Sequence, residues 1–147
     1  MEIITTSSAE TEALGNKIAT KLQGGEIIAL CGELGSGKTT MAKGLAKALG
    51  VTEEILSPTF VILKKYHSAG KKITTLNHID AYRLNSDWEL ADLGFAEISE
   101  DKHSVTLVEW ADKVAKLLPP ATIKISFFYL GDDKRKILIK NLKKDII

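Results

Sequence analysis

Cysteine, proline, arginine and long apolar runs are all scarce in this chain of 147 residues. The one cysteine, Cys31, has no second cysteine to pair with, which excludes an internal disulfide framework. No apolar stretch approaches the roughly 20 residues that cross a bilayer, and the N-terminal stretch MEIITTSSAE lacks the basic and apolar regions of a signal peptide. We therefore expect a soluble, cytoplasmic protein without a membrane partner.

Arginine occurs only at Arg83 and Arg135, and the 20 lysines and arginines nearly balance the 19 aspartates and glutamates, for a net charge of +1. Tight autonomous binding to nucleic acid depends on clustered cationic residues. We therefore expect any contact with RNA to run through a partner protein. The apolar share of 44% is enough to bury one core, and we predict a single domain over residues 1–147.

The pattern of apolar residues predicts alternating strands and helices. Glu26–Cys31 reads EIIALC, which is typical of a strand buried on both faces. Further strands are predicted at Glu2–Thr5, Phe60–His67, Ile73–Ile79, Val105–Val108, Ile123–Leu130 and Arg135–Lys140. Helices are predicted at Ala9–Leu22 (capped by Ser7 or Ser8), Thr39–Leu49, Ser86–Leu93 and Ala111–Leu117. These elements indicate one α/β domain whose mixed β-sheet has a parallel core and antiparallel hairpins and is flanked by helices.

The segment GELGSGKTT, residues 32–40, follows the apolar strand and leads into a predicted helix. Gly32, Gly37, Lys38 and Thr39 match the motif G-x-x-x-x-G-K-[ST] in full. In this motif the loop amides and the helix N-terminus converge on phosphate oxygens, the lysine meets the β- and γ-phosphates, and the threonine hydroxyl binds Mg²⁺. The sequence therefore predicts a P-loop NTPase-like domain with nucleotide contacts from Gly35, Ser36, Gly37, Lys38, Thr39 and Thr40.

A phosphate site of this kind needs carboxylates, because Mg²⁺ prefers hard oxygen ligands and the attacking water must be positioned. Asp80 follows LNHI and Glu109 follows VTLV, so either side chain can lie at the carboxyl edge of a strand beside the loop. Glu109 follows the more apolar strand, and we assign the metal to it and to Thr39. Asp80 then organises the nucleophile or supports the metal site. The predicted catalytic set is Lys38, Asp80 and Glu109.

Four blocks of the sequence together resemble the TsaE family, the small ATPases of bacterial tRNA threonylcarbamoyladenosine (t6A) synthesis. They are the glycine-rich loop, Ser57-Pro58-Thr59-Phe60, His78-Ile79-Asp80-Ala81-Tyr82-Arg83 and Val108-Glu109-Trp110, in that order. The resemblance implies that the protein binds ATP with Mg²⁺ and acts with TsaD, the threonylcarbamoyl transferase, and with TsaB. Its tRNA would be reached only through that complex, and ATP hydrolysis would drive a conformational step between rounds of modification.

The same resemblance implies roles for individual residues. Thr39 and Glu109 match metal-binding positions, Asp80 and Trp110 match positions needed for activity, and Ser8 matches a position near the nucleotide.

The resemblance also implies a cationic nucleotide contact from the closing hairpin. Lys134 is our candidate, and Arg135 stays open because the register of that hairpin is not determined by the sequence. We further expect the segments Ser57–Phe60 and His78–Arg83 to sense the state of the nucleotide, since loss of a γ-phosphate or metal can release such loops.

Other P-loop functions remain as alternatives. A small-molecule kinase usually brings arginines to a lid over the transferred phosphoryl group, and this chain has few of them. A GTPase is expected to carry N-K-x-D, whereas Asn16-Lys17-Ile18-Ala19 lacks the acid and precedes the glycine loop. The main alternative is a nucleotide-binding adaptor that acts without significant hydrolysis. For the ATPase itself, we expect hydrolysis that is slow alone and stimulated by its partners.

Overall fold

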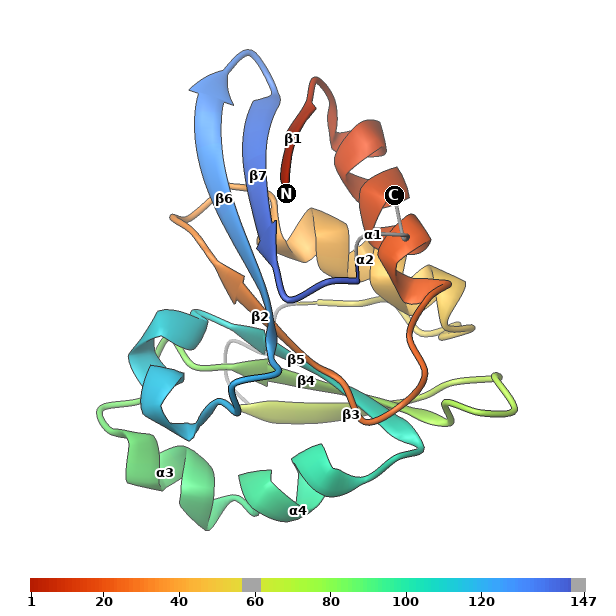
Figure 1. The fold of residues 1–147 in the computed structure, drawn as a ribbon, viewed down its shortest axis with the longest axis vertical. Coiled ribbons are helices and arrows are strands. Elements are labelled where there is room, and N and C mark those ends of the chain that lie inside the picture. The colour runs from red at the N-terminus through yellow and green to blue at the C-terminus, as the bar shows by residue number, and fades with distance from the viewer. Residues whose placement is uncertain (57–61, 144–147) are drawn as a thin grey trace.

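The computed structural model describes residues 1–56 and 62–143. Its strands are β1 (Glu2–Thr5), β2 (Ile27–Cys31), β3 (Leu63–His67), β4 (Thr75–Asp80), β5 (Ser104–Glu109), β6 (Ile123–Gly131) and β7 (Lys134–Lys140). Its helices are α1 (Ser8–Ala19), α2 (Lys38–Ala48), α3 (Asp87–Asp92), α4 (Phe95–Glu100) and the 3₁₀ helix η1 (Ala111–Leu117). Figure 1 shows how these elements are arranged around one twisted sheet.

The seven strands form a single mixed sheet in the order β1-β7-β6-β2-β5-β4-β3. At its centre β2 pairs in parallel with both β5 and β6, and β4 pairs in parallel with β5. The two edges are antiparallel, with β3 against β4 on one side and β7 between β6 and β1 on the other. The predicted α/β fold, with a parallel core and antiparallel hairpins, is confirmed.

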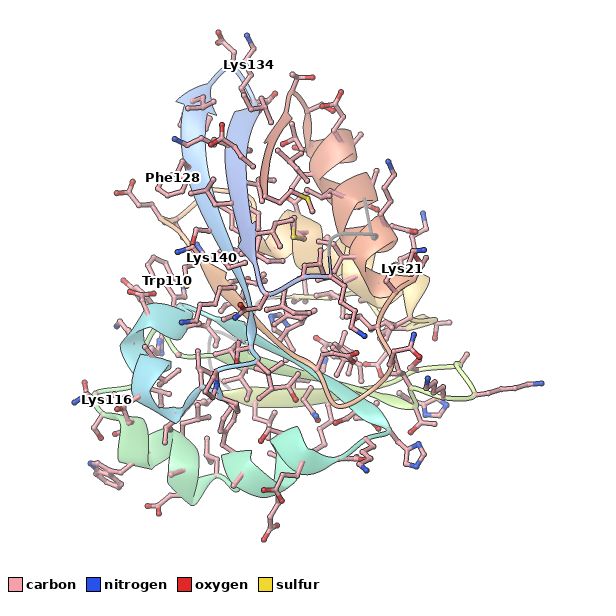
Figure 2. The ribbon with its side chains drawn as sticks, in the orientation of Figure 1. Lys21, Trp110, Lys116, Phe128, Lys134 and Lys140 are labelled. Carbon is pink, nitrogen blue, oxygen red and sulfur yellow. The ribbon has the colours of Figure 1, made fainter. Side chains whose placement is uncertain are left out.

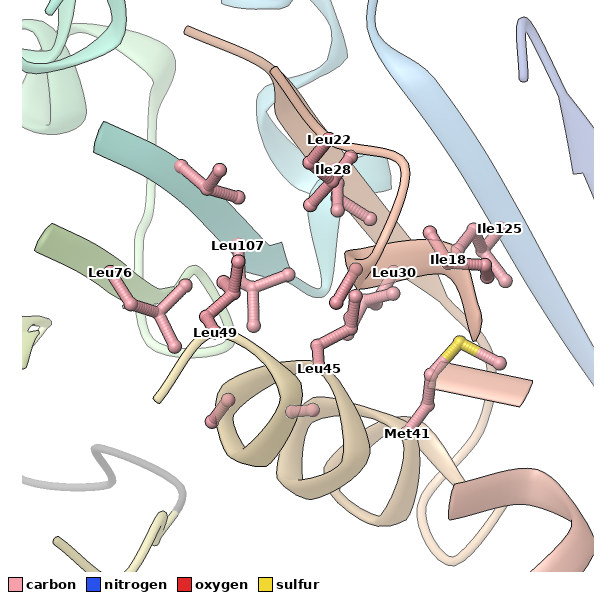
Figure 3. Packing of buried hydrophobic residues seen from close by; sticks show 14 of the residues in the cluster. Ile18, Leu22, Ile28, Leu30, Met41, Leu45, Leu49, Leu76, Leu107 and Ile125 are labelled. Carbon is pink, nitrogen blue, oxygen red and sulfur yellow. The ribbon is translucent and has the colours of Figure 1, made fainter. Parts of the chain in front are cut away.

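The larger core lies between the sheet and the pair α1 and α2, which pack against one another. Leu30 of β2, Leu45 of α2 and Leu107 of β5 are fully buried in it, as Figure 3 shows. The smaller core lies on the opposite face, where Ile79, Phe95 and others join α3, α4 and η1 to the central strands. Successive residues of β2 therefore pack on opposite faces, which explains why this strand is apolar almost throughout.

The first helix ends earlier than its apolar pattern predicts. Leu22 is buried in the larger core, so the pattern continues to this residue, but α1 stops at Ala19. The amides of Lys21 and Leu22 bond back three residues rather than four, as in Leu22 N to Ala19 O at 3.1 Å. At the other end Ser7, not Ser8, caps the helix, because its hydroxyl accepts a hydrogen bond from Glu10 N at 3.1 Å.

Two further differences lie after β4. The helix α4 was not predicted; it starts after Gly94, whose φ of 80° breaks the chain away from α3, and it is short enough to escape a periodicity search. The segment Ala111–Leu117 is helical as predicted but of 3₁₀ type, with non-helical dihedrals at Val114. The predicted strand start at Phe60 lies outside the described residues, within which β3 begins at Leu63.

The closing hairpin is tighter than predicted. The strand β6 extends to Gly131 and β7 begins at Lys134, so that Asp132 and Asp133 alone form the turn. Both aspartates have positive φ, 47° and 61°, as a two-residue turn that matches the strand twist requires. Over the described ranges, 1–56 and 62–143, the structure contains no helix with the length and apolar character needed to span a membrane.

Candidate functional site

The glycine-rich loop connects the end of β2 to the start of α2, at the carboxyl edge of the parallel strands. Gly37 precedes the helix and has φ of 111°, a backbone conformation that residues with a Cβ rarely adopt. A Cβ on Gly32 would lie 2.6 Å from Ser36 Oγ and 3.0 Å from Phe127 O, so the loop also needs glycine where it packs against β6. The loop therefore leads directly into the N-terminus of α2, where free backbone amides favour an anion.

Lys38 is the first residue of α2 and its side chain folds back under the loop. Its Nζ donates to Gly32 O at 2.6 Å and to Glu33 O at 2.8 Å. Burial lowers the pKa of the Lys38 amino group from its ordinary value, while the nearby carboxylates of Glu109 and Asp80 act in the opposite direction. The Lys38 amino group is thus held at the centre of the loop by backbone carbonyls.

Glu109 connects the loop helix to the neighbouring strand. Its side chain is 2% exposed at the end of β5, and Thr39 Oγ1 donates to its Oε1 at 3.2 Å. On its other side, His78 Nε2 of β4 lies 3.2 Å from Glu109 Oε2, and His78 is completely buried. Glu109 thus lies between α2 and β4, with a hydrogen bond from Thr39 on one side and the buried His78 ring on the other.

Asp80 is the last residue of β4 and pairs across the sheet with Glu109. Its Oδ1 accepts a hydrogen bond from Tyr82 N at 2.9 Å. Burial raises the pKa of the Asp80 carboxyl above its ordinary value, and the neighbouring charge of Glu109 adds to this, while the Tyr82 bond opposes it. Two carboxylates with different surroundings therefore lie side by side at the edge of the sheet.

Trp110 follows Glu109 and has φ of 56°, which is rare for a bulky residue and strains the backbone. In this conformation its ring lies over the amino group of Lys38, 4.3 Å from Nζ to the ring centroid. The ring of Tyr82 packs against it with 4.9 Å between centroids. The strained turn after β5 thus places an aromatic wall beside the glycine loop.

Two hollows adjoin the loop. The smaller, of about 160 Å³, is lined by Leu34, Gly35, Ser36, Gly37, Lys38, Thr39, Thr40, Glu109, Trp110 and Arg135. It brings together all the loop residues that the sequence predicts as nucleotide contacts. The larger, of about 810 Å³, lies between the loop, Trp110 and the residues Ser126–Tyr129 of β6.

The hairpin residue that reaches the loop is Arg135 and not Lys134. Arg135 Nη2 donates to Gly35 O at 3.3 Å, whereas Lys134 is exposed at the start of β7. The alternation of β7 contained this signal, because Ile137 and Ile139 are buried in the larger core and Arg135 shares their face. The candidate cationic contact therefore moves from Lys134 to Arg135.

The remaining predicted residues are placed as follows. Ser8, the first residue of α1, is exposed and does not line either hollow in the described part of the chain. The sensor segment Ser57–Phe60 lies outside the described residues. Within His78–Arg83, His78 contacts Glu109 and Asp80 pairs across the sheet with it. Tyr82 packs against Trp110. The sequence did not predict the contact of His78 with Glu109, because this contact depends on the pairing of β4 with β5.

The donor set suits a magnesium ion that shares its coordination with phosphate and water. Within residues 1–56 and 62–143, no group of three or more histidine, cysteine, aspartate or glutamate side chains could hold a metal ion by itself. Thr39 Oγ1 and Glu109 Oε1, 3.2 Å apart, are hard oxygen donors at the loop. Mg²⁺ is commonly bound by one or two protein oxygens together with substrate phosphates, so these residues fit such an ion.

Comparison with known proteins identifies several relatives that match most of this chain. The chain is 38% identical to "tRNA threonylcarbamoyladenosine biosynthesis protein TsaE" of Treponema pallidum over 139 residues, which cover 95% of this chain and 99% of the relative. It is also 38% identical to the protein of that name from Bacillus subtilis, over 90% of this chain and 80% of the relative. The Streptomyces coelicolor protein is 43% identical over 71% of this chain and 70% of its own length.

The fold has a counterpart among solved structures. The crystal structure of Bacillus subtilis YdiB superposes with a TM-score of 0.80 and 32% sequence identity, covering 99% of this chain and 88% of YdiB. A family profile described as "Threonylcarbamoyl adenosine biosynthesis protein TsaE" matches residues 5–137, which include the loop, both carboxylates and Arg135. The chain therefore belongs to the TsaE family, which takes part in the biosynthesis of threonylcarbamoyladenosine in tRNA.

Proposed function

We propose that this chain binds and hydrolyses ATP with Mg²⁺ as an accessory protein of tRNA threonylcarbamoyladenosine modification. The observation that carries the proposal is the contact between Thr39 Oγ1 and Glu109 Oε1, 3.2 Å apart at the N-terminus of α2. It joins a hydroxyl of the glycine loop helix to a buried carboxylate from a different strand. A structural turn before a core helix needs no such carboxylate, whereas a metal-dependent phosphate site does.

Each residue has a distinct part in the proposed reaction. The loop amides and Lys38 bind the phosphates, and Thr39 and Glu109 hold the metal ion. When bound, Mg²⁺ neutralises charge that develops on the phosphate oxygens. Asp80 orients the attacking water and accepts its proton, for which the raised pKa of its carboxyl is suited. Arg135 and Trp110 flank the loop and limit access of bulk water.

The proposed partners are TsaD and TsaB, and tRNA is contacted only through their complex. The described residues form one sheet with its covering helices, and the glycine loop lies at its edge. Such a protein suits hydrolysis that drives a conformational step in a larger assembly, not transfer of phosphate to a second substrate. On this proposal hydrolysis is slow alone, is stimulated by the pair, and permits repeated rounds of modification.

The proposal is tested by reconstitution with purified TsaB and TsaD. Phosphate release is measured for the chain alone, with the pair, and with the pair plus tRNA, while modified tRNA is followed over many turnovers. We expect release to rise with the pair and repeated turnover to require this chain, with Lys38→Ala as the inactive control. Repeated turnover without the chain would contradict the function. Support of turnover without phosphate release would instead favour the nucleotide-binding adaptor.

A further inference from the structure

One half of the sheet is packed on a single face. Ile125 and Phe127 of β6, with Ile137 and Ile139 of β7, point into the larger core beneath α1 and α2. Because side chains alternate along a strand, the residues between them point to the opposite face. The smaller core, which α3, α4 and η1 build on that side, includes no described residue of β1, β6 or β7. Figure 1 shows α3 and α4 beneath the other half of the sheet.

The residues of this open face form regular rows across the three strands. We call it the β1-β7-β6 face and define it by Glu2, Ile4, Lys124, Ser126, Phe128, Lys136, Leu138 and Lys140. Its apolar centre includes Ile4, which is 56% exposed, and Phe128, which is 44% exposed. Lys136 pairs with both of them and extends its amino group over the Phe128 ring, 5.1 Å from the ring centroid. Ile4 and Phe128 thus flank the apolar stem of Lys136, and exposed apolar surface that gathers on one face of a monomer commonly marks an interaction site.

Two lysines lie directly opposite one another at the end of this face. Lys124 of β6 pairs with Lys140 of β7, and both side chains are exposed. Like charges at directly opposite positions of a sheet are destabilising. Within residues 1–56 and 62–143, neither of these lysines forms an ion pair that offsets this repulsion. An acidic group from another molecule would do so.

The face also continues into the candidate functional site. Ser126 and Phe128 line the larger hollow together with Trp110 and the loop residue Leu34, whose side chain is 91% exposed. A molecule that covers Phe128 therefore reaches the hollow that the glycine loop also lines. In Figure 2 Phe128, Lys140 and Trp110 lie along the same side of the molecule, away from α1.

We propose that the β1-β7-β6 face docks a protein partner that presents an apolar patch bordered by carboxylates. The inference rests on the proposed function, since it names the surface by which the partner complex would reach the nucleotide site. The exposed apolar side chains of Ile4 and Phe128, which flank Lys136, favour protein over RNA. A nucleic-acid surface would concentrate cations along a phosphate track, and arginine is absent from this face.

The test uses two variants of the face and a matched control for each. Phe128→Ser is compared with Trp88→Ser, which alters a 64% exposed aromatic residue on α3. Lys140→Glu is compared with Lys21→Glu, because Lys21 is exposed on the opposite side of the molecule (Figure 2). The new carboxylate in Lys140→Glu lies opposite Lys124, so this variant is expected to remain folded. Thermal unfolding and ATP affinity are measured for all four.

Binding of each purified variant to the TsaB–TsaD pair is then measured by titration at two salt concentrations. We expect both face variants to weaken binding at least about tenfold, and both controls to change it less than about twofold. The ATP affinity of Lys140→Glu should equal that of the wild type. Wild-type binding should weaken with salt, and Lys140→Glu should lose part of that dependence.

Three outcomes would overturn the inference. Wild-type-like binding by both face variants would exclude this face as the docking site and would leave the proposed function intact. Failure of the wild-type chain to bind the TsaB–TsaD pair would contradict both the docking site and the proposed function. Binding of isolated tRNA that is lost in Lys140→Glu and Phe128→Ser, with protein binding unchanged, assigns the face to RNA instead.

Discussion

At the scale of single residues, Lys38 makes several contacts within the glycine loop. Its amino group is held by two carbonyls of its own loop and lies over Trp110. The proposed phosphate contact requires this cation to turn from carbonyl oxygens to phosphate oxygens, both of which accept its protons. Burial lowers the pKa of this amino group, and the neighbouring carboxylates of Glu109 and Asp80 oppose that lowering.

We predict that Lys38→Ala removes most of the affinity for ATP without unfolding the protein. The substitution deletes a charge-assisted contact, worth about 1.5–3 kcal/mol or roughly ten- to hundredfold in affinity. Calorimetric titration with ATP and Mg²⁺ measures the loss, and circular dichroism checks the fold. ATP binding at wild-type strength in the folded variant would contradict the assignment of the loop.

Substitutions of the two carboxylates, Glu109 and Asp80, are predicted to have different effects. Glu109→Gln should weaken the Mg²⁺-dependent part of nucleotide affinity, because it removes the charge beside Thr39 Oγ1. Asp80→Asn should retain binding and lose hydrolysis, because it removes the proton acceptor. Titration with and without Mg²⁺, combined with phosphate release, separates the effects, and the reverse pattern would exchange the two roles.

Asp80→Asn is also predicted to change stability with pH. The folded state raises the pKa of Asp80, so the folded protein holds this proton more tightly than the unfolded chain does. The stability that this provides is present at low pH and is lost as pH rises through the folded pKa. Without Mg²⁺, the variant should therefore unfold at a higher temperature than the wild type near neutral pH, and the gain should vanish toward about pH 4. A pH-independent difference would exclude this cause.

At the scale of elements, the site depends on how closely α1 approaches α2. Gly15 and Gly44 lie where the two helices meet, and a Cβ on Gly44 would lie 2.0 Å from Glu12 O. Because α2 begins in the glycine loop, this contact determines where the helix N-terminus lies relative to Glu109. Glycine inside a helix normally lowers its stability, and here it permits the close approach.

Gly44→Ala is therefore predicted to destabilise the protein by about 1–3 kcal/mol, although Ala is the better helix former. Denaturant unfolding measures the change. The control Lys43→Ala alters the neighbouring exposed position of the same helix and should leave stability within about 0.5 kcal/mol. Stabilisation by Gly44→Ala would show that the helices can separate without cost.

At the scale of the whole molecule, both cores share one sheet. The larger core lies on one face of β2 and the smaller on the other, so loss of either exposes the same central strands. The candidate site lies at the end of those strands and includes residues from α2, β4, β5 and β7. Unfolding of any part should therefore dismantle the site.

We accordingly predict one cooperative thermal transition, which ATP with Mg²⁺ shifts upward as a unit. A ligand at a hundred times its dissociation constant adds about 2.7 kcal/mol to the stability of the folded state. Differential scanning calorimetry measures the shift, and Lys38→Ala should show little of it at the same ligand concentration. A second transition that ATP does not move would indicate an independently folding part.

The loop and the strand periodicity could be predicted from the sequence because both are local. The spacing of Gly32, Gly37, Lys38 and Thr39 specifies the phosphate loop within a few residues, and EIIALC specifies a strand buried on both faces. The ends of apolar segments also marked Asp80 and Glu109. Local signals failed at α1, where the buried Leu22 continues the apolar pattern beyond the helix.

The tertiary structure decided which distant residues meet. Glu109 reaches Thr39, 70 residues away, because β5 pairs with β2, and His78 reaches Glu109 because β4 pairs with β5. The open β1-β7-β6 face depends in the same way on strand order. Side-chain periodicity reports only which face a residue occupies, whereas strand order follows from burying both faces of the sheet at once, which involves the whole chain.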